Sequence, residues 1–276
     1  MDSIRENRTK DDILEEIRLE QSADIYGKKC FVITEGSDDV LFIRKMFSRS
    51  VICLESFAGK SGLMEIMAEQ DAASDSIIGI RDRDYVDETA LPDRIFLYDH
   101  CCLEMMLLAE QAVTESFYQI YYKGKNSCDT FLLNTMRQLA PYSILRKRNE
   151  KESLGISFRK AGFGDLIDFS NESLNCARLF QRTGEAERFH ACQQEADELE
   201  ETALWEMTNG HDICTFLGCL SKTGKKGMDE TSVRNILLVS YRKEDFFKTT
   251  LRQNILSYQH QKHLEFLEET DQQNPS

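Results

Sequence analysis

Proline is scarce in this chain, and its cysteines lack the spacings of a zinc site. Only three prolines occur among 276 residues, so composition marks domain boundaries poorly. None of the nine cysteines forms a CxxC pair, and no Cys/His spacing matches a zinc site, which excludes a zinc-binding module. A disulfide framework is not expected at this length, so we predict a reducing, cytoplasmic compartment.

The sequence also lacks a long apolar run. No run approaches the roughly 20 apolar residues that a helix needs to span a bilayer. The chain opens with the polar and charged residues Met1-Asp2-Ser3-Ile4-Arg5-Glu6, so we expect no signal peptide. Both observations argue against a membrane partner.

Positive charge is in deficit. The 34 Lys and Arg residues face 48 Asp and Glu residues, a formal net charge of -14. Proteins that coat nucleic acid gain most of their affinity from Lys and Arg set against phosphates, so this balance excludes a passive coat. A local basic strip can still outweigh the global sign, although such a group is usually a solvated face. The two candidate strips are Arg146, Lys147 and Arg148, and Lys222, Lys225 and Lys226.

Four segments differ in their patterns, and 41% hydrophobic residues suffice for a sizeable core. Residues 1–26 predict an exposed amphipathic helix whose apolar stripe includes Ile13, Leu14, Ile17 and Leu19, and we expect it to pack on the main domain or on a partner. Residues 27–110 alternate between strand and helix patterns, which predicts an α/β core with a parallel sheet. Residues 111–220 lose the strand pattern and predict a helical insert, with a long polar helical stretch at 185–209. Residues 221–276 predict a helical C-terminal segment.

Within the α/β core, each apolar run is followed by a helical pattern. Ser37 is placed to cap the first of these helices. The expected strands are 29–34, 51–57, 77–81 and 94–98, and the expected helices are 38–47, 63–69 and 104–110.

Acidic residues follow two of these strands. Glu35 comes directly after the first strand, and Asp82 and Asp84 follow the third. If the two strands are neighbours in a parallel sheet, these three carboxylates meet at its carboxyl edge, where ligand sites usually form. Alternate residues of an extended segment point the same way, so Asp82 and Asp84 can face one cation. A hard divalent cation is the usual way to neutralise such acids, which indicates metal-dependent phosphate chemistry.

Two further acids, Asp38 and Asp39, fall in the first turn of the helix after Glu35. Acids at this position are favoured by the helix dipole by roughly 0.3–1 kcal/mol each, so a structural role suffices for at least one of them. Asp38 is the better candidate for a metal contact through water. The plain alternatives are an ordinary strand-to-helix turn at Glu35 and a solvated loop at Asp82 and Asp84.

The order of these acids resembles the Toprim domain. Glu35-Gly-x-Asp-Asp, then a strand ending in Asp82-x-Asp84, is similar to the acidic motifs of that fold. The segment 98–108, Tyr-Asp-His-Cys-Cys-Leu-Glu-Met-Met-Leu-Leu, resembles the corresponding segment of a Toprim-like family related to the OLD nucleases. That family includes the AriB effectors of the PARIS anti-phage systems. The resemblance covers most of residues 27–110 well, and residues 205–260 loosely.

This resemblance implies a site for Mg²⁺ or Mn²⁺ and a catalytic role for two residues. Glu35 would be the acid/base or a metal ligand, and Lys60 would neutralise the scissile phosphate. The alternatives for Lys60 and Glu104 are a surface lysine and a plain acid at a helix start. The implied metal-binding residues are Glu35, Asp38, Asp39, Asp82, Asp84 and Glu104.

The function implied by the resemblance is a Mg²⁺-dependent nuclease that acts as an effector in prokaryotic anti-phage defence. Its substrate would be tRNA or another RNA in preference to DNA. Its implied partner is a companion ABC-type ATPase that controls it, and a homodimer is a further alternative. A second hypothesis is a non-catalytic Toprim-like module that binds a partner protein or nucleic acid through an idle acidic site.

Overall fold

The computed structural model describes residues 8–69, 74–86, 91–158, 162–221 and 227–268. The chain forms two units, and each is described by itself. The first unit comprises residues 1–82, 88–98 and 243–276, and the second comprises residues 83–87 and 99–242. This division differs from the four segments expected from the sequence. The expected C-terminal segment 221–276 is divided, with residues up to 242 in the second unit and residues 243–276 in the first.

Four parallel strands form the sheet of the first unit, in the order β2-β1-β3-β4. The expected strands are all present, and the prediction of a parallel α/β sheet is confirmed. β1 is buried along its whole length and lies between β2 and β3, which explains its uninterrupted apolar run. The strands are β1 (Phe31–Thr34), β2 (Ile52–Glu55), β3 (Ile77–Arg81) and β4 (Ile95–Leu97).

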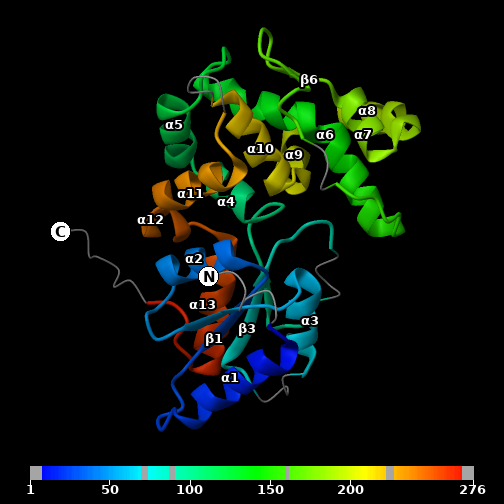
Figure 1. Cartoon of the computed structure of the whole chain (residues 1–276). Coiled ribbons are helices and arrows are strands. Elements are labelled where there is room, and N and C mark those ends of the chain that lie inside the picture. Colours follow the sequence, from blue (N-terminus) through cyan, green and yellow to red (C-terminus); the bar gives the residue numbers. More distant parts are fainter. Residues whose placement is uncertain (1–7, 70–73, 87–90, 159–161, 222–226, 269–276) are drawn as a thin grey trace, which may run out of the picture. The chain divides into compact units, whose positions relative to one another are not determined.

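Helices cover the sheet of the first unit (Figure 1). Helix α1 buries Ile13, Leu14 and Ile17 in one hydrophobic cluster with residues of α3 and of the strands. Its stripe is therefore part of the core, as expected for a helix that packs on the main domain, although Leu19 is 63% exposed. The helices of this unit are α1 (Lys10–Ser22), α2 (Ser37–Met46), α3 (Gly59–Glu69), α12 (Lys243–Phe246) and α13 (Thr250–Lys262).

The second unit is mostly helical and is arranged around one long helix, α6 (Cys128–Glu152), which contacts α7, α8, α9 and α10. The other helices are α4 (Leu103–Ala109), α5 (Gln111–Ile120), α7 (Cys176–Thr183), α8 (Phe189–Asp197), α9 (Glu201–Met207), α10 (Gly210–Leu220) and α11 (Glu230–Ser240).

Two features of the second unit differ from expectation. A short antiparallel hairpin of β5 (Ile167–Asp168) and β6 (Ser173–Leu174) interrupts the region in which only helices were predicted. The long helical stretch at 185–209 is divided into α8 and α9. The break falls in the acidic run 197–201, where like charges three and four residues apart disfavour a continuous helix.

Candidate functional site

Glu35 and Asp82 follow two neighbouring strands at the carboxyl edge of the sheet. Glu35 comes directly after β1, and Asp82 comes directly after β3. The two strands are parallel, and Thr34 pairs with Ile80 in their register. The expectation that these strands are neighbours is therefore confirmed, and it places both acids just beyond the paired ends.

The last residue of β3 is a buried cation that the sequence argument left without a role. Arg81 is only 3% exposed, and its Nε lies 3.5 Å from Oε1 of Glu35. The same Nε donates a hydrogen bond of 3.1 Å to the backbone carbonyl of Asp82. The protein itself thus supplies one positive charge to the acidic edge. The signal in the sequence was a charged residue ending an otherwise apolar strand, because such a residue needs a partner.

The two acids at the start of α2 differ in what they contact. Asp39 accepts a hydrogen bond of 2.9 Å from the backbone N–H of Gly36, which is the N-cap of the helix. Ser37 is the first helical residue, so the prediction that it caps the helix was wrong. An acid at the third position of a helix can accept the N-cap N–H, which has no partner within the helix, so this contact gives Asp39 a structural role. Asp38 is left as the candidate for ligand contact.

Tyr98, directly after β4, is a further residue of this edge that the sequence argument missed. Its side chain is fully buried, and its ring packs edge-on against Phe42 of α2 with the centroids 5.7 Å apart. Burial, and then the nearby carboxylate of Asp39, raise the pKa of the Tyr98 phenol well above its ordinary value. The phenol therefore stays protonated and can act only through hydrogen bonding and packing.

Lys60 follows β2, as expected, but it lies in the first turn of α3, because this helix begins at Gly59 and not at residue 63. The loop before it is tied to the end of β1, because the backbone N–H of Ser56 donates to the carbonyl of Thr34 at 2.9 Å. The Ser56 hydroxyl also donates to the carbonyl of Gly59 at 2.6 Å. These bonds fix the start of α3 at the same edge of the sheet as Glu35.

A cleft of about 670 Å³ opens beside this edge in the first unit. Glu35 lines it together with Ser37 and Arg44 of α2, and Ser56 and Gly59 of the loop after β2. Arg44 is an exposed residue of α2 that lines the cleft. A substrate bound in this cleft would contact both a carboxylate and a cation.

The remaining two predicted metal ligands belong to the second unit. Asp84 has a φ of 46°, and its backbone N–H donates to the carbonyl of Cys101 at 2.8 Å. Glu104 is 8% exposed, and its Oε1 lies 2.8 Å from Nε of Arg234 in α11. This ion pair gives Glu104 a structural role in joining α4 to α11, and its place in the first turn of α4 is that of the helix-start acid considered from the sequence.

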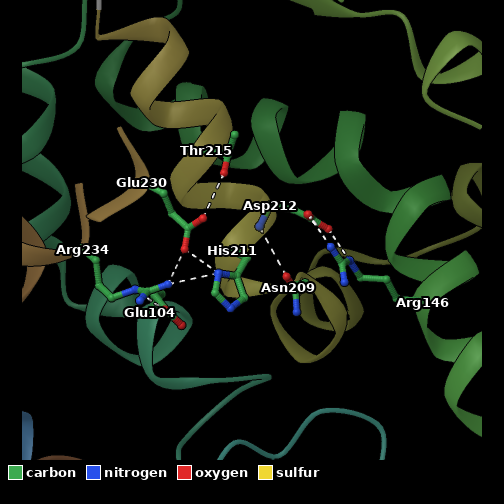
Figure 2. A network of polar contacts seen from close by, with 8 residues as sticks. All are labelled: Glu104, Arg146, Asn209, His211, Asp212, Thr215, Glu230 and Arg234. Atoms are coloured by element: carbon green, nitrogen blue, oxygen red, sulfur yellow. Dashed lines mark hydrogen bonds and ion pairs between the residues drawn. The ribbon is translucent and has the colours of Figure 1, made fainter. Parts of the chain in front are cut away.

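Figure 2 shows that Glu104 is part of a larger polar network in the second unit. Arg234 also pairs with Glu230 of its own helix, and Glu230 contacts the imidazole of His211. The contact with Glu230 raises the pKa of His211, and partial desolvation of this largely exposed imidazole opposes the rise. The network therefore links α4, α10 and α11 through alternating charges.

Figure 2 also shows Arg146, which lies beside Asp212. Its Nε and Nη2 donate to the two carboxylate oxygens of Asp212 at 2.6 and 2.7 Å. Asp212 is 5% exposed, and the Arg146 guanidinium also lies 4.3 Å from the centre of the Phe158 ring. A bidentate pair of this kind joins two helices, here α6 and α10, and it occupies the Nε–Nη2 edge of the guanidinium, which could otherwise hold a phosphate.

Two of the three residues in the first predicted nucleic-acid strip are paired with carboxylates of the protein. Arg146 is committed to Asp212, and Arg148 pairs with Glu195 of α8 at 2.7 Å. Lys147 between them is half-buried. The second strip, Lys222, Lys225 and Lys226, lies outside the described residues.

The chemistry of the acidic edge can be compared with what Mg²⁺ requires. In the part of the chain that the structure describes, no three or more His, Cys, Asp or Glu side chains are grouped so as to hold a metal. Mg²⁺ commonly takes one or two protein carboxylates and completes its shell with water and substrate phosphates. The hard oxygens of Glu35 and Asp82, on adjacent strand ends, fit that smaller requirement.

Comparisons with known proteins add no family. The sequence matches no family model. No curated protein is significantly similar to it. None of the helices within the described ranges combines the length and the apolar character needed to cross a bilayer.

Proposed function

We propose that the acidic edge of the first unit hydrolyses phosphodiester bonds with bound Mg²⁺ or Mn²⁺, so that the protein is a nuclease with a Toprim-like fold. The observation that carries this proposal is the placement of Glu35 and Asp82 on adjacent parallel strand ends, with the buried Arg81 beside Glu35. Carboxylates at the carboxyl edge of a parallel sheet, beside an open cleft, are the usual setting of a phosphate site.

Each residue of the edge would have a separate task. Asp82, with Asp38 through water, would hold the cation. When bound, Mg²⁺ would polarise the scissile phosphate and lower the pKa of the attacking water. Glu35 would accept the proton of that water, and Arg81 would hold the Glu35 carboxylate in one orientation. Lys60, in the first turn of α3, would neutralise a phosphate oxygen.

Substrate and biological role rest on the resemblance given by the sequence motifs. We infer RNA, with tRNA favoured over DNA, and a role as an effector in prokaryotic anti-phage defence. A nuclease of this kind needs restraint, and a companion ABC-type ATPase would supply it. The formal charge of -14 would suit a docking surface for such a protein partner.

A specific observation favours the second hypothesis, a non-catalytic module that binds a partner protein or nucleic acid. Arg81 already balances part of the charge of Glu35, so this carboxylate does not depend on a metal for neutralisation. An acidic edge whose charge is balanced by Arg81 would be stable without a bound metal, and could serve only to bind a partner.

The experiment that separates the two is a cleavage assay on the full chain with labelled tRNA and supercoiled plasmid. Each substrate is incubated with Mg²⁺, with Mn²⁺ or with EDTA, both with and without the companion ABC-type ATPase proposed above. The nuclease proposal expects cutting with either metal and none with EDTA. Binding of the substrate without cutting under every condition would favour the module instead.

A further inference from the structure

Strand β2 lies at one edge of the sheet in the first unit. The backbone N–H groups of Ile52 and Ser56 donate to the carbonyls of Cys30 and Thr34, each at 2.9 Å. Because the N–H and C=O groups of successive residues in a strand point to opposite sides, those of Cys53 and Glu55 point away from β1. No hydrogen bond within the described part of the chain uses these outward groups. The edge therefore offers unpaired donors and acceptors, which are a template for another strand.

This open strand is one wall of the cleft described above. The residues 51–57, which include the whole of β2, all line it. Helix α2 lines it with residues that are three and four positions apart and so share one helix face, namely Ser37, Val40, Leu41 and Arg44. Leu41 is 51% exposed on that face. A segment lying along β2 would therefore find an apolar side chain as well as free backbone groups.

The charges that line the cleft indicate what such a segment would carry. Arg8 and Glu16 contact each other, and Glu35 has the cation described above. Arg44 and Glu55 form no ion pair with another residue in the ranges that the structure describes. These two charges are the ones that a ligand could balance.

Arg44 and Glu55 can be reached from one face of an added strand. Alternate side chains of β2 share a face, so Cys53 and Glu55 lie on the same side of the sheet. Burial raises the pKa of the Cys53 thiol to about 12, and the Arg44 guanidinium opposes this rise, which places Arg44 on that side too. A neighbouring strand would therefore meet Arg44 beside Cys53, and Glu55 two residues further on.

We propose that β2 binds an extended segment of a partner protein as an additional strand, with an acidic side chain beside Arg44 and a basic one, two residues away, beside Glu55. Main-chain hydrogen bonds provide affinity in this binding mode, and alternate side chains provide specificity. A second copy of the chain fits this recess less well than a single strand does, because helices pack on both faces of its sheet. The inference concerns binding and does not depend on cleavage, although Glu35 lines the same cleft and a bound segment would compete there with a substrate.

The probe is a display library of random nine-residue segments, selected on the full chain. We expect enrichment of sequences rich in β-branched residues, with an acid and a base two positions apart. The best sequence is then made as a labelled synthetic peptide, and its Kd is measured by fluorescence anisotropy. Only alternate N–H groups of an added strand face β2, so N-methylation of one alternate set should weaken binding at least about tenfold while N-methylation of the other set should not.

Two pairs of variants test the edge and its charge. Glu55→Pro removes the outward N–H without breaking a bond to β1, because an edge strand tolerates proline on its free side. It should weaken binding at least about tenfold more than Glu55→Thr, which keeps the N–H. Arg44→Glu should prefer a peptide whose acid is replaced by lysine, by about tenfold or more over the original. Arg49→Glu, at an exposed arginine that does not line the cleft, should keep the wild-type preference.

Several results would overturn the inference. One is a library that enriches no sequence on wild type over Glu55→Pro. Another is a peptide that tolerates N-methylation at both sets of positions, because it would not be bound as a strand. If light scattering shows a dimer of the chain alone that Glu55→Pro dissociates, the occupant is a second copy and the proposal is wrong. If circular dichroism shows that Glu55→Pro is unfolded, the N-methylated peptides decide, because they leave the protein unchanged.

Discussion

Nε of Arg81 lies 3.5 Å from Oε1 of Glu35, so the acid that opens the candidate site is paired with an arginine from the neighbouring strand. The arginine is almost completely buried and the glutamate is 20% exposed at its side chain. A buried cation without a partner is strongly unfavourable, whereas a partly exposed carboxylate can recover water. Breaking this pair should therefore cost more stability when Arg81 is the residue left behind than when Glu35 is.

The first prediction concerns this pair. Glu35→Gln should lower the free energy of unfolding by about 3 kcal/mol, because it removes the carboxylate that faces the buried Arg81 guanidinium. Adding Arg81→Met to that variant should recover part of the loss, since the charge is then removed from both sides. Urea unfolding of the two single variants and the double variant measures the coupling. Strictly additive effects would show that the two side chains do not interact.

A second prediction separates the two acids of α2. Asp39→Asn should cost about 1 kcal/mol of stability, because it weakens the contact with the backbone N–H of Gly36. Asp38→Asn should cost less stability and reduce nuclease activity more. The comparison requires thermal unfolding and initial cleavage rates for both variants. The assignment fails if Asp39→Asn is the variant that unfolds as easily as wild type while losing activity.

The location of the acidic edge could be predicted from sequence, and its internal pairing could not. Apolar runs ending at Thr34 and Arg81 identify buried strands, and parallel pairing then places the residues that follow them at one edge. Which cation faces Glu35 depends on the strand order and register, which the sequence does not state. The same limit applies to Tyr98, whose burial beside Asp39 results from packing against α2.

Ion pairs between helices that are distant in sequence were even harder to predict. Arg146 and Asp212 are 66 residues apart in sequence, and nothing local to the basic run 146–148 shows that its first member pairs with a distant helix. Glu104 likewise reaches Arg234 only because α4 and α11 pack together. Charged residues on a helix look alike in sequence whether they face solvent or another helix, so such basic runs are weak evidence for a nucleic-acid surface.

A third prediction uses the glycine beside Glu104. A Cβ added at Gly210 would lie 2.0 Å from Oε2 of Glu104 and 2.9 Å from Sγ of Cys102. Gly210→Ala should therefore destabilise the second unit by about 1–3 kcal/mol through overpacking, although alanine normally favours a helix. Gly164→Ala is the matched control, because no atom lies within 4 Å of the added carbon there. Equal stability of the two variants in urea would contradict the close contact.

A fourth prediction concerns pH and His211. Its contact with Glu230 raises the pKa of the imidazole above the ordinary value of 6.5. The folded state therefore binds this proton more tightly than the unfolded chain does. The resulting stabilisation is fully present below pH 6.5 and is lost as the pH rises through the raised pKa. Arg234 and Glu104 also face this network, with opposite effects on the imidazole.

The test compares urea unfolding of wild type and His211→Asn from about pH 5.5 to about pH 8.5. Wild type should lose more stability than the variant over this range, by less than about 1 kcal/mol because the imidazole is exposed. A larger loss in the variant than in wild type would reverse the assigned direction.

The central claim is that the carboxyl edge of the sheet in the first unit performs metal-dependent cleavage. Its most direct test is the single-turnover cleavage rate in Mg²⁺ of wild type, Asp82→Asn and Asp75→Asn. Asp75 precedes β3 at the opposite edge of the sheet, where it pairs with Lys262 at 3.0 Å, so it is a matched control for the loss of one carboxylate. We predict that Asp82→Asn lowers the rate by roughly 10²-fold or more while Asp75→Asn cuts like wild type. An Asp82→Asn variant that cuts as fast as Asp75→Asn would contradict the account.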